Sequence, residues 1–289
     1  MISASLVKEL REKTGAGMLD CKKALEENNG NIDAAIDWLR EKGISKAAKK
    51  AERIAAEGLA AIYTEGNVAT IVEVNSETDF VAKNVEFTTM VDSILKAIAS
   101  NNPKTNEDVL ALDVEGQTIN DLIVDKTAKI GEKLSFRRFA RVVKSDSESF
   151  GTYIHMGGKI ASLTVVNGDN EEAAKDVAMQ AAAMRPQYVN IESVPAEDVE
   201  HEKAVIKEQV INEGKKPEFA EKIVEGRIRK FFEETVLEEQ AFIKDSGLTV
   251  KAYLENNNSK LVKLVKFEVG EGMEKRNDNF AEEVMSQIK

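Results

Sequence analysis

An alternation of apolar and polar residues occurs twice in this chain, and each time a helical pattern follows it. The first copy covers residues 59–63 and 68–74, and residues 153–167 repeat it. A period of two is typical of a β-hairpin when turn residues separate the two runs. The segments that follow, residues 85–98 and 171–184, have the spacing of amphipathic helices. The sequence therefore predicts an α+β protein with two duplicated β-β-α subdomains that are built on antiparallel sheets.

Residues 3–42 contain three short helical patterns, separated by a Gly-rich turn and an Asn-Asn-Gly turn. In the third pattern, Ile32, Ile36 and Leu39 have the i, i+4, i+7 spacing of one helix face, and Gly43 is expected to end the helix. Three helices in so short a segment are typical of a bundle like that of ubiquitin-associated (UBA) domains. The Ala- and Lys-rich stretch that follows predicts a connecting helix.

Residues 195–245 are charged and strongly helical, with Pro217 at the start of a second long helix. They predict a helical hairpin, which either protrudes and mediates association, such as a homodimer, or folds back onto the sheet. A late strand at 261–269 is expected to complete the second sheet, and a C-terminal helix is expected at 278–288. The domain boundaries that follow are a UBA-like three-helix bundle at 1–44, a connecting helix at 45–58, one core subdomain at 59–145, the other at 146–194 plus 246–269, the hairpin insertion at 195–245 and a C-terminal module at 270–289.

Charge and composition exclude several classes of protein. The net charge of −11 argues against a general nucleic-acid binder, since such proteins carry concentrated positive charge. No apolar run approaches the roughly 20 residues needed to cross a bilayer, and the N-terminus does not have the layout of a signal peptide. The single cysteine, Cys21, excludes an internal disulfide and fits a reducing compartment. We therefore expect a cytoplasmic protein with no direct binding to nucleic acid or membranes.

The chain also lacks the residue patterns of common catalytic sites. Gly158-Lys159 is followed by Ile160, so this segment is not a phosphate-binding Walker loop. Two histidines and one cysteine cannot form a zinc site by any common spacing, and no nucleophile motif occurs. We therefore expect no catalytic residue, no metal site and no cofactor, and we do not expect an enzyme.

The stretch 76–84 lies between the first hairpin and its helix. Thr78 and Asp79 are typical of a helix N-terminus, because a short side-chain oxygen there accepts a hydrogen bond from an unpaired backbone N–H. Phe80 follows them at this strand-to-helix turn, and Lys83 lies close by. From this chemistry alone, the favoured interpretation is that Phe80 packs into the core. The other interpretation is that Phe80 contacts a partner.

Three motifs in this chain resemble those of the bacterial elongation factor Ts family. They are Thr-Asp-Phe-Val-Ala-Lys-Asn at 78–84, the N-terminal run at 6–25 and the tail Phe-Glu-Val-Gly-Glu-Gly-Met-Glu-Lys at 267–275. The resemblance extends over the whole chain in order, and it includes the helical insertion of the long form of the family. Lys159 and Ala161 depart from the pattern, because the family often has Arg and Gly there.

The resemblance implies a guanine-nucleotide exchange factor of protein biosynthesis. Such a protein binds elongation factor Tu and promotes the release of GDP for GTP during translation elongation. By the same resemblance, Thr78, Asp79, Phe80 and Val81 approach the partner's nucleotide site. There Phe80 acts as a wedge, and its neighbours disturb the Mg²⁺ and phosphate-loop region. The nucleotide-free partner is expected to be bound most tightly.

Further partner contacts are implied outside this turn. They are Arg11, Gly17, Met18, Leu19, Lys83 and His155. The C-terminal helix, from Asp278, is expected to dock on the partner's nucleotide-binding domain. For the Gly-rich turn of the bundle, the residues alone leave a second interpretation open, namely turn chemistry with one buried Met. The alternative function is a UBA-type adaptor or scaffold without exchange activity, although an adaptor has no reason to present an Asp-Phe pair at a strand–helix turn.

Overall fold

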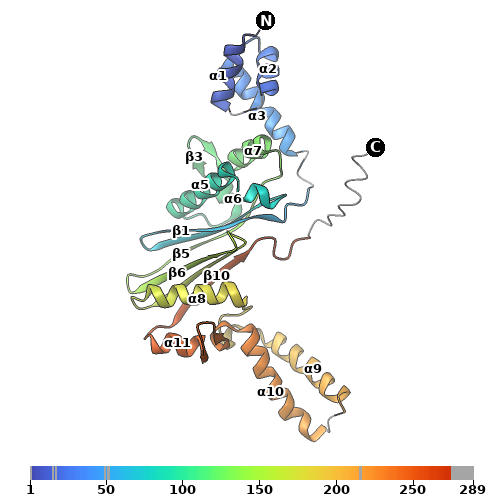
Figure 1. Cartoon of the computed structure of the whole chain (residues 1–289), viewed down its shortest axis with the longest axis vertical. Helices are drawn as coiled ribbons and strands as arrows, with labels where there is room; N and C mark the ends of the chain where they lie inside the picture. The colour runs from blue at the N-terminus through green and yellow to red at the C-terminus, as the bar shows by residue number, and fades with distance from the viewer. Residues whose placement is uncertain are drawn as a thin grey trace. The chain divides into compact units, whose positions relative to one another are not determined.

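The computed structural model describes residues 2–14, 16, 18–48, 50, 53–214 and 217–274 of the 289-residue chain (Figure 1). These residues form two compact units. The first unit contains residues 2–64, 70–141 and 267–274, and the second contains residues 65–69 and 142–266. Helices and small antiparallel sheets are combined in the chain, so the predicted α+β class is confirmed.

The first unit begins with the predicted three-helix bundle, which consists of α1 (Ala4–Thr14), α2 (Met18–Glu27) and α3 (Ile32–Ala48). Leu10, Cys21 and Leu25 are fully buried at its centre. Ile32, Ile36 and Leu39 pack against this centre from α3, as their spacing predicts.

Helix α3 does not end at Gly43, so that part of the prediction is wrong. It continues to Ala48, and β1 begins at Glu57 after residues 53–56, which are not helical. Residues 45–48 of the stretch that we assigned to a separate connecting helix over 45–58 therefore belong to α3. Strong helix formers flank Gly43 on both sides, and their summed preference outweighs the roughly 1 kcal/mol cost of a single glycine.

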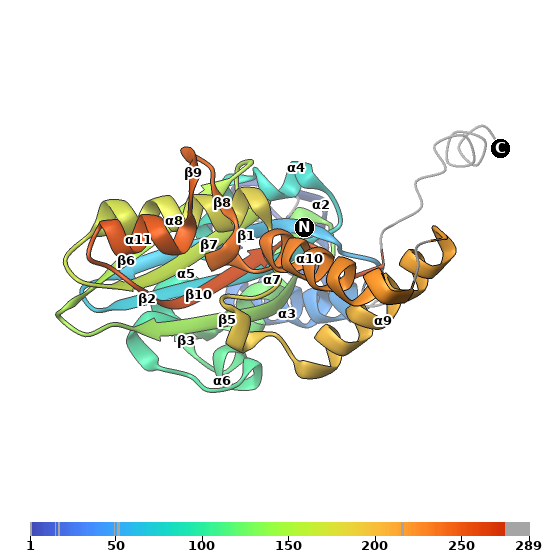
Figure 2. The same cartoon turned by 90° about the horizontal axis from the view of Figure 1, so that it is seen from below.

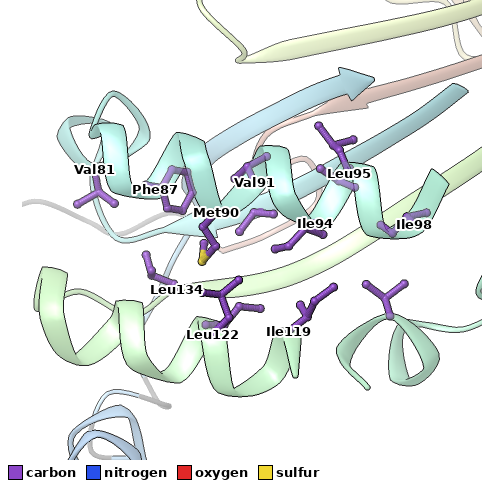
Figure 3. Close-up of a cluster of buried hydrophobic side chains, with 14 residues drawn as sticks. Val81, Phe87, Met90, Val91, Ile94, Leu95, Ile98, Ile119, Leu122 and Leu134 are labelled. Carbon is purple, nitrogen blue, oxygen red and sulfur yellow. The ribbon is translucent and has the colours of Figure 1, made fainter. Parts of the chain in front are cut away.

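A three-stranded sheet with helices packed against it forms the rest of this unit, from β1 (Glu57–Glu65), β2 (Val68–Ser76), α4 (Asp79–Ala82), α5 (Val85–Asn101), α6 (Asn106–Leu110), β3 (Asp113–Val114), β4 (Gln117–Thr118), α7 (Ile119–Ile130) and β5 (Ser135–Val143). The strand order is β1-β2-β5. Val72 and Val74 on the central strand meet Phe87 and Ile94 of α5 in one buried cluster. Figure 3 shows the side chains of α5 and α7 gathered in this cluster. The hydrophobic core thus lies directly beneath the segment that joins β2 to α5.

The second unit repeats this arrangement on a sheet formed by β6 (Glu148–His155), β7 (Ile160–Asn167) and β10 (Leu261–Glu268). Its order is β10-β7-β6, so the second strand of the hairpin is again central and a later strand pairs with it. A helix again follows the central strand, here α8 (Glu171–Met184). The two β-β-α subdomains predicted from the repeated pattern are therefore confirmed.

Small residues let α8 approach its sheet closely. A Cβ atom added at Gly151 on β6 would lie 2.0 Å from the carbonyl carbon of Ala174. Thr164, which is opposite Gly151 on β7, donates a hydrogen bond to the Ala174 carbonyl at 2.7 Å. Any side chain larger than hydrogen at position 151 would push the helix away from the sheet.

The predicted helical hairpin consists of α9 (Ala196–Asn212) and α10 (Pro217–Thr235). Ile206, Val210 and Ile228 are buried between the two helices. Figure 1 shows the pair extending away from the sheet of its own unit, so the hairpin protrudes rather than folding back. No helix in the described part of the chain combines the length and apolar character that crossing a membrane requires.

Five short elements join the hairpin to the sheet, and the sequence patterns did not reveal them: η1 (Ile191–Ser193), η2 (Leu237–Glu239), β8 (Ala241–Phe242), β9 (Asp245–Thr249) and α11 (Val250–Asn256). In Figure 2, α8 and α11 lie side by side along the sheet. Leu254 of α11 and Val177 of α8 belong to one buried cluster. These elements are too short for a helical or strand period to identify them.

A buried carboxylate attaches the segment 267–274 to the first unit. Glu73 on β2 is fully buried and accepts hydrogen bonds from Arg137 at 2.8 Å, Arg138 at 2.6 Å and the Gly270 backbone N–H at 2.8 Å. Burial alone would raise the pKa of Glu73, but the hydrogen bonds from Gly270, Arg137 and Asn75 and the charge of Arg138 hold this pKa below its usual value.

The predicted helix at 278–288 lies outside the described residues.

We expect Glu73→Gln to lower the free energy of unfolding at pH 7 by about 3 kcal/mol, because it leaves two arginines without their buried partner. The folded pKa lies below the unfolded value of 4.5. The stability contributed by the charge is therefore complete above that value and is lost as the pH falls through the folded pKa. Urea unfolding at pH 7 and below pH 4.5 measures the difference between wild type and variant. A difference that does not shrink at the lower pH would contradict this.

Candidate functional site

The turn after β2 contains half of the predicted site residues. The strand ends at Ser76, a single helical turn, α4, follows at Asp79–Ala82, and α5 begins at Val85. Asn84 starts α5 with a capping bond, since its side-chain oxygen accepts a hydrogen bond from the Glu86 N–H at 2.8 Å. The chain thus changes direction twice within this segment.

Thr78 is the residue that precedes α4, but its side chain makes no capping hydrogen bond to the helix. The side-chain cap predicted from its residue type is therefore wrong. Its hydroxyl donates a hydrogen bond to Glu132 Oε1 at 2.7 Å, and its backbone N–H donates one to Glu132 Oε2 at 3.0 Å. A carboxylate is a stronger acceptor than a neutral group. Thr78 is therefore held by a residue of the loop that follows α7, and not by its own helix.

Phe80 and Val81 face opposite environments although they are neighbours. The Phe80 residue is 80% exposed, whereas Val81 is 7% exposed and belongs to the buried cluster under α5 (Figure 3). Successive helical residues point about 100° apart, and in this single turn it is Val81 that points into the core. The interpretation that Phe80 packs into the core is therefore wrong. Val81 anchors the turn and also lines the cleft described below, and its predicted partner contact stays a prediction.

Charged groups surround the exposed ring. Asp79 and Lys83 form an i, i+4 ion pair of 3.1 Å on the surface of the turn. Exposed pairs of this kind contribute little to stability, typically about 0.3–0.5 kcal/mol. Among the residues that the structure describes, no cluster of His, Cys, Asp and Glu has an arrangement that could hold a metal ion. The Lys83 side chain is 76% exposed and that of Asp79 is 46% exposed, so both charges lie at the surface of the turn.

An open cleft of about 610 Å³ brings the turn together with the bundle. Arg11 and Met18 line it from the bundle, and Phe80 lines it from the turn. Together with Val81, which also lines it, four of the predicted site residues therefore share one cleft. Leu19 is 83% exposed beside Met18, which is 61% exposed, so the interpretation of a buried Met is wrong. Gly17 lies outside the described residues.

Glu86 gives this cleft an ion-pair cluster that the sequence analysis missed. Its carboxylate contacts Lys129 at 2.6 Å and Lys126 at 3.2 Å. The hydrogen bond from Lys129 is the main reason why the pKa of Glu86 lies below its usual value. The two lysines have i, i+3 spacing on a predicted helix, but nothing in the sequence connects them with Glu86. The cluster fixes the first turn of α5 against α7.

His155 lies in the second unit, at the end of β6. Its ring stacks on Tyr153 with 6.0 Å between ring centroids. Ile154 and Met156 on either side of it are exposed. The predicted contact residue is therefore accompanied by apolar surface on the tip of this hairpin.

A comparison with models of known protein families matches residues 77–271 to the family described as Elongation factor TS. The match covers more than half of the 289-residue chain and includes the exposed turn. The chain belongs to the elongation factor Ts family. Members of this family act in translation elongation as nucleotide exchange factors, without covalent chemistry of their own. The matched region begins at Glu77, immediately before the turn that presents Phe80.

We expect Phe80→Ala to change the free energy of unfolding by less than about 0.5 kcal/mol, because the ring is already in water. Val81→Ala is expected to lower it by roughly 1–3 kcal/mol, because it removes methyl groups from a packed cluster. Urea unfolding followed by far-ultraviolet circular dichroism measures both. A loss for Phe80→Ala as large as that for Val81→Ala would mean that the ring is buried in solution.

Proposed function

We propose that this protein binds elongation factor Tu and accelerates the release of GDP, so that GTP can replace it. The observation that best supports this is the position of Phe80, a large apolar side chain that is 80% exposed on a turn anchored from below. Membership of the elongation factor Ts family supports the same function. The exposed Met18 lines the same cleft as Phe80, and apolar side chains gathered in this way often mark an interaction site.

In the proposed complex, Phe80 wedges between helices of the partner's nucleotide-binding domain. Thr78 and Asp79 lie next to it and disturb the surroundings of the partner's Mg²⁺ and phosphate loop. Magnesium requires nearly octahedral coordination at about 2.0–2.1 Å, so a small displacement of its ligands weakens its binding, and with it that of GDP. Lys83, ion-paired with Asp79, limits the directions in which that carboxylate can point.

One aromatic ring is insufficient for this task. An acceleration on the order of 10⁴-fold requires about 5.5 kcal/mol of preference for the opened partner. Burying one Phe supplies roughly 1.5–3 kcal/mol. We assign the remainder to a wide interface, which includes Arg11, Met18 and Leu19 on the bundle and His155 on the second unit. Gly17 and the predicted helix from Asp278 belong to the same proposed interface.

The exchange function has a thermodynamic counterpart. Coupling between two ligands is reciprocal, so a factor that weakens GDP binding is itself bound less tightly by the GDP form. We therefore propose that the nucleotide-free partner is bound most tightly. We also propose that the protein acts in the cytoplasm and does not bind nucleic acid directly. A homodimer through residues 195–245 stays a prediction.

Release of a fluorescent GDP analogue from elongation factor Tu tests the function directly. Substoichiometric wild-type protein is expected to accelerate release, and Phe80→Ala to slow the accelerated rate roughly 10- to 100-fold, in line with the burial of one Phe. Ile191→Ala is a matched control, because it truncates an exposed apolar side chain outside the proposed interface.

Two outcomes would contradict the proposal. Binding without acceleration by the wild type would favour an adaptor function. An accelerated rate unchanged by Phe80→Ala would exclude the ring as the wedge, even if exchange itself occurred.

A further inference from the structure

The loop between α7 and β5 contacts both the Phe80 turn and the segment that leads from the bundle. It begins at Gly131, whose φ of +90° ends α7 in the left-handed conformation that favours glycine. Glu132 and Lys133 follow, and β5 starts at Ser135. Nothing in the local sequence pattern indicates that this loop has a role beyond joining two elements.

Glu132 fixes both polar groups of Thr78 that can donate a hydrogen bond. One carboxylate oxygen accepts from the hydroxyl at 2.7 Å, and the other accepts from the backbone N–H at 3.0 Å. The Thr78 carbonyl in turn accepts a hydrogen bond from the buried Ser76 hydroxyl at 2.9 Å. The backbone is thus held on both sides of Thr78, two residues before Phe80.

Glu77 adds a second connection to the same loop. Its side chain is 8% exposed and accepts a hydrogen bond from the Lys133 backbone N–H at 2.6 Å. It also pairs with Arg53, 3.3 Å from each carboxylate oxygen. The Lys133 ammonium donates to the Arg53 carbonyl at 2.9 Å, and the Lys50 ammonium donates to the Gly131 carbonyl. The loop therefore binds the turn and the segment that precedes β1 at once.

Phe80 depends on such external support. Its helix is a single turn without a side-chain cap, and a single turn has almost no stability of its own. The exposed ring has few contacts that could hold it in place. Val81 fixes the depth of the turn, and the contacts of Ser76 and Glu77 hold the chain that leads into it. The two hydrogen bonds from Thr78 to Glu132 hold the residue that directly precedes the helix.

We propose that Glu132 is a positioning residue for Phe80, and that the loop 131–133 holds the Phe80 turn and the segment from the bundle in one arrangement. The restriction of the ring is a property of the free protein. The consequence for GDP release rests on the proposed function. A ring held in its binding orientation loses less conformational freedom when a partner covers it. Glu132 therefore acts on exchange only through Phe80.

The first test needs no partner. Phe80→Trp in a Trp38→Phe background gives a single indole at the tip of the turn, and time-resolved fluorescence anisotropy reports its local motion. We expect Glu132→Ala to increase the amplitude of the fast component. Glu132→Gln is expected to leave it near the parent value, because a hydroxyl both donates and accepts, so the amide can keep both contacts with Thr78.

The second test is a double-mutant cycle on GDP release. Glu132→Ala is expected to slow exchange about 10- to 100-fold, as misplacement of a contact group does, and Glu132→Gln to restore most of the rate. In a Phe80→Ala background, Glu132→Ala is expected to have no further effect, because the two residues act through one contact. Asp108→Ala is the matched control, since this carboxylate also accepts two hydrogen bonds in the first unit, from the backbone N–H groups of Lys104 and Thr105.

Three results would overturn the proposal: unchanged anisotropy in Glu132→Ala, an equal slowing by Glu132→Ala with and without Phe80, or an equal slowing by Asp108→Ala. If Glu132→Ala does not fold, Thr78→Val removes only the hydroxyl contact with Glu132, and the anisotropy of the free protein is compared between Thr78→Val and the parent. If the wild type fails to accelerate release, the proposed function is wrong, while the anisotropy of the free protein still decides whether Glu132 positions the turn.

Discussion

Val81 occupies the position of α4 that faces the hydrophobic cluster, and this packing contact leaves Phe80 in water. In this single turn, Phe80 lies about 100° around the helix axis from Val81, and its side chain stays outside the cluster. Folding therefore removes the small Val81 side chain from water and leaves the large Phe80 side chain exposed. That free energy, roughly 1.5–3 kcal/mol, is released only when another surface covers the ring. A partner that covered the Phe80 ring would therefore gain this free energy on binding.

The supports of this turn come from distant parts of the sequence, and this makes it a rigid feature rather than a loop. Glu132 holds Thr78 from the loop after α7, and Arg53 pairs with Glu77 from the segment before β1. Rigid presentation lowers the entropy lost on binding. The bundle lines the same cleft as the ring. We propose that a partner contacts both as one surface, in line with the wide interface that the proposed nucleotide release requires.

Local sequence patterns predicted the regular elements well and the functional turn poorly, for one physical reason. The helix expected at 171–184 has the same bounds as α8, and α10 begins at Pro217 as expected, because periodicity and backbone chemistry are local. A four-residue helix has no period, so the sequence does not reveal that Val81 and not Phe80 is buried. Thr78 was misassigned as a side-chain cap because its partner, Glu132, is 54 residues away. Long-range contacts of this kind leave no local signal.

The measurement that tests the central claim most directly is the affinity of this protein for nucleotide-free and for GDP-bound elongation factor Tu, determined by calorimetry for wild type and Phe80→Ala. We expect the wild type to bind the nucleotide-free form more tightly. The substitution is expected to reduce the ratio of the two affinities by roughly 10- to 100-fold, because the ring contacts mainly the opened partner. An equal loss of affinity for both forms would contradict the account, since a contact that binds two states equally cannot shift the equilibrium between them.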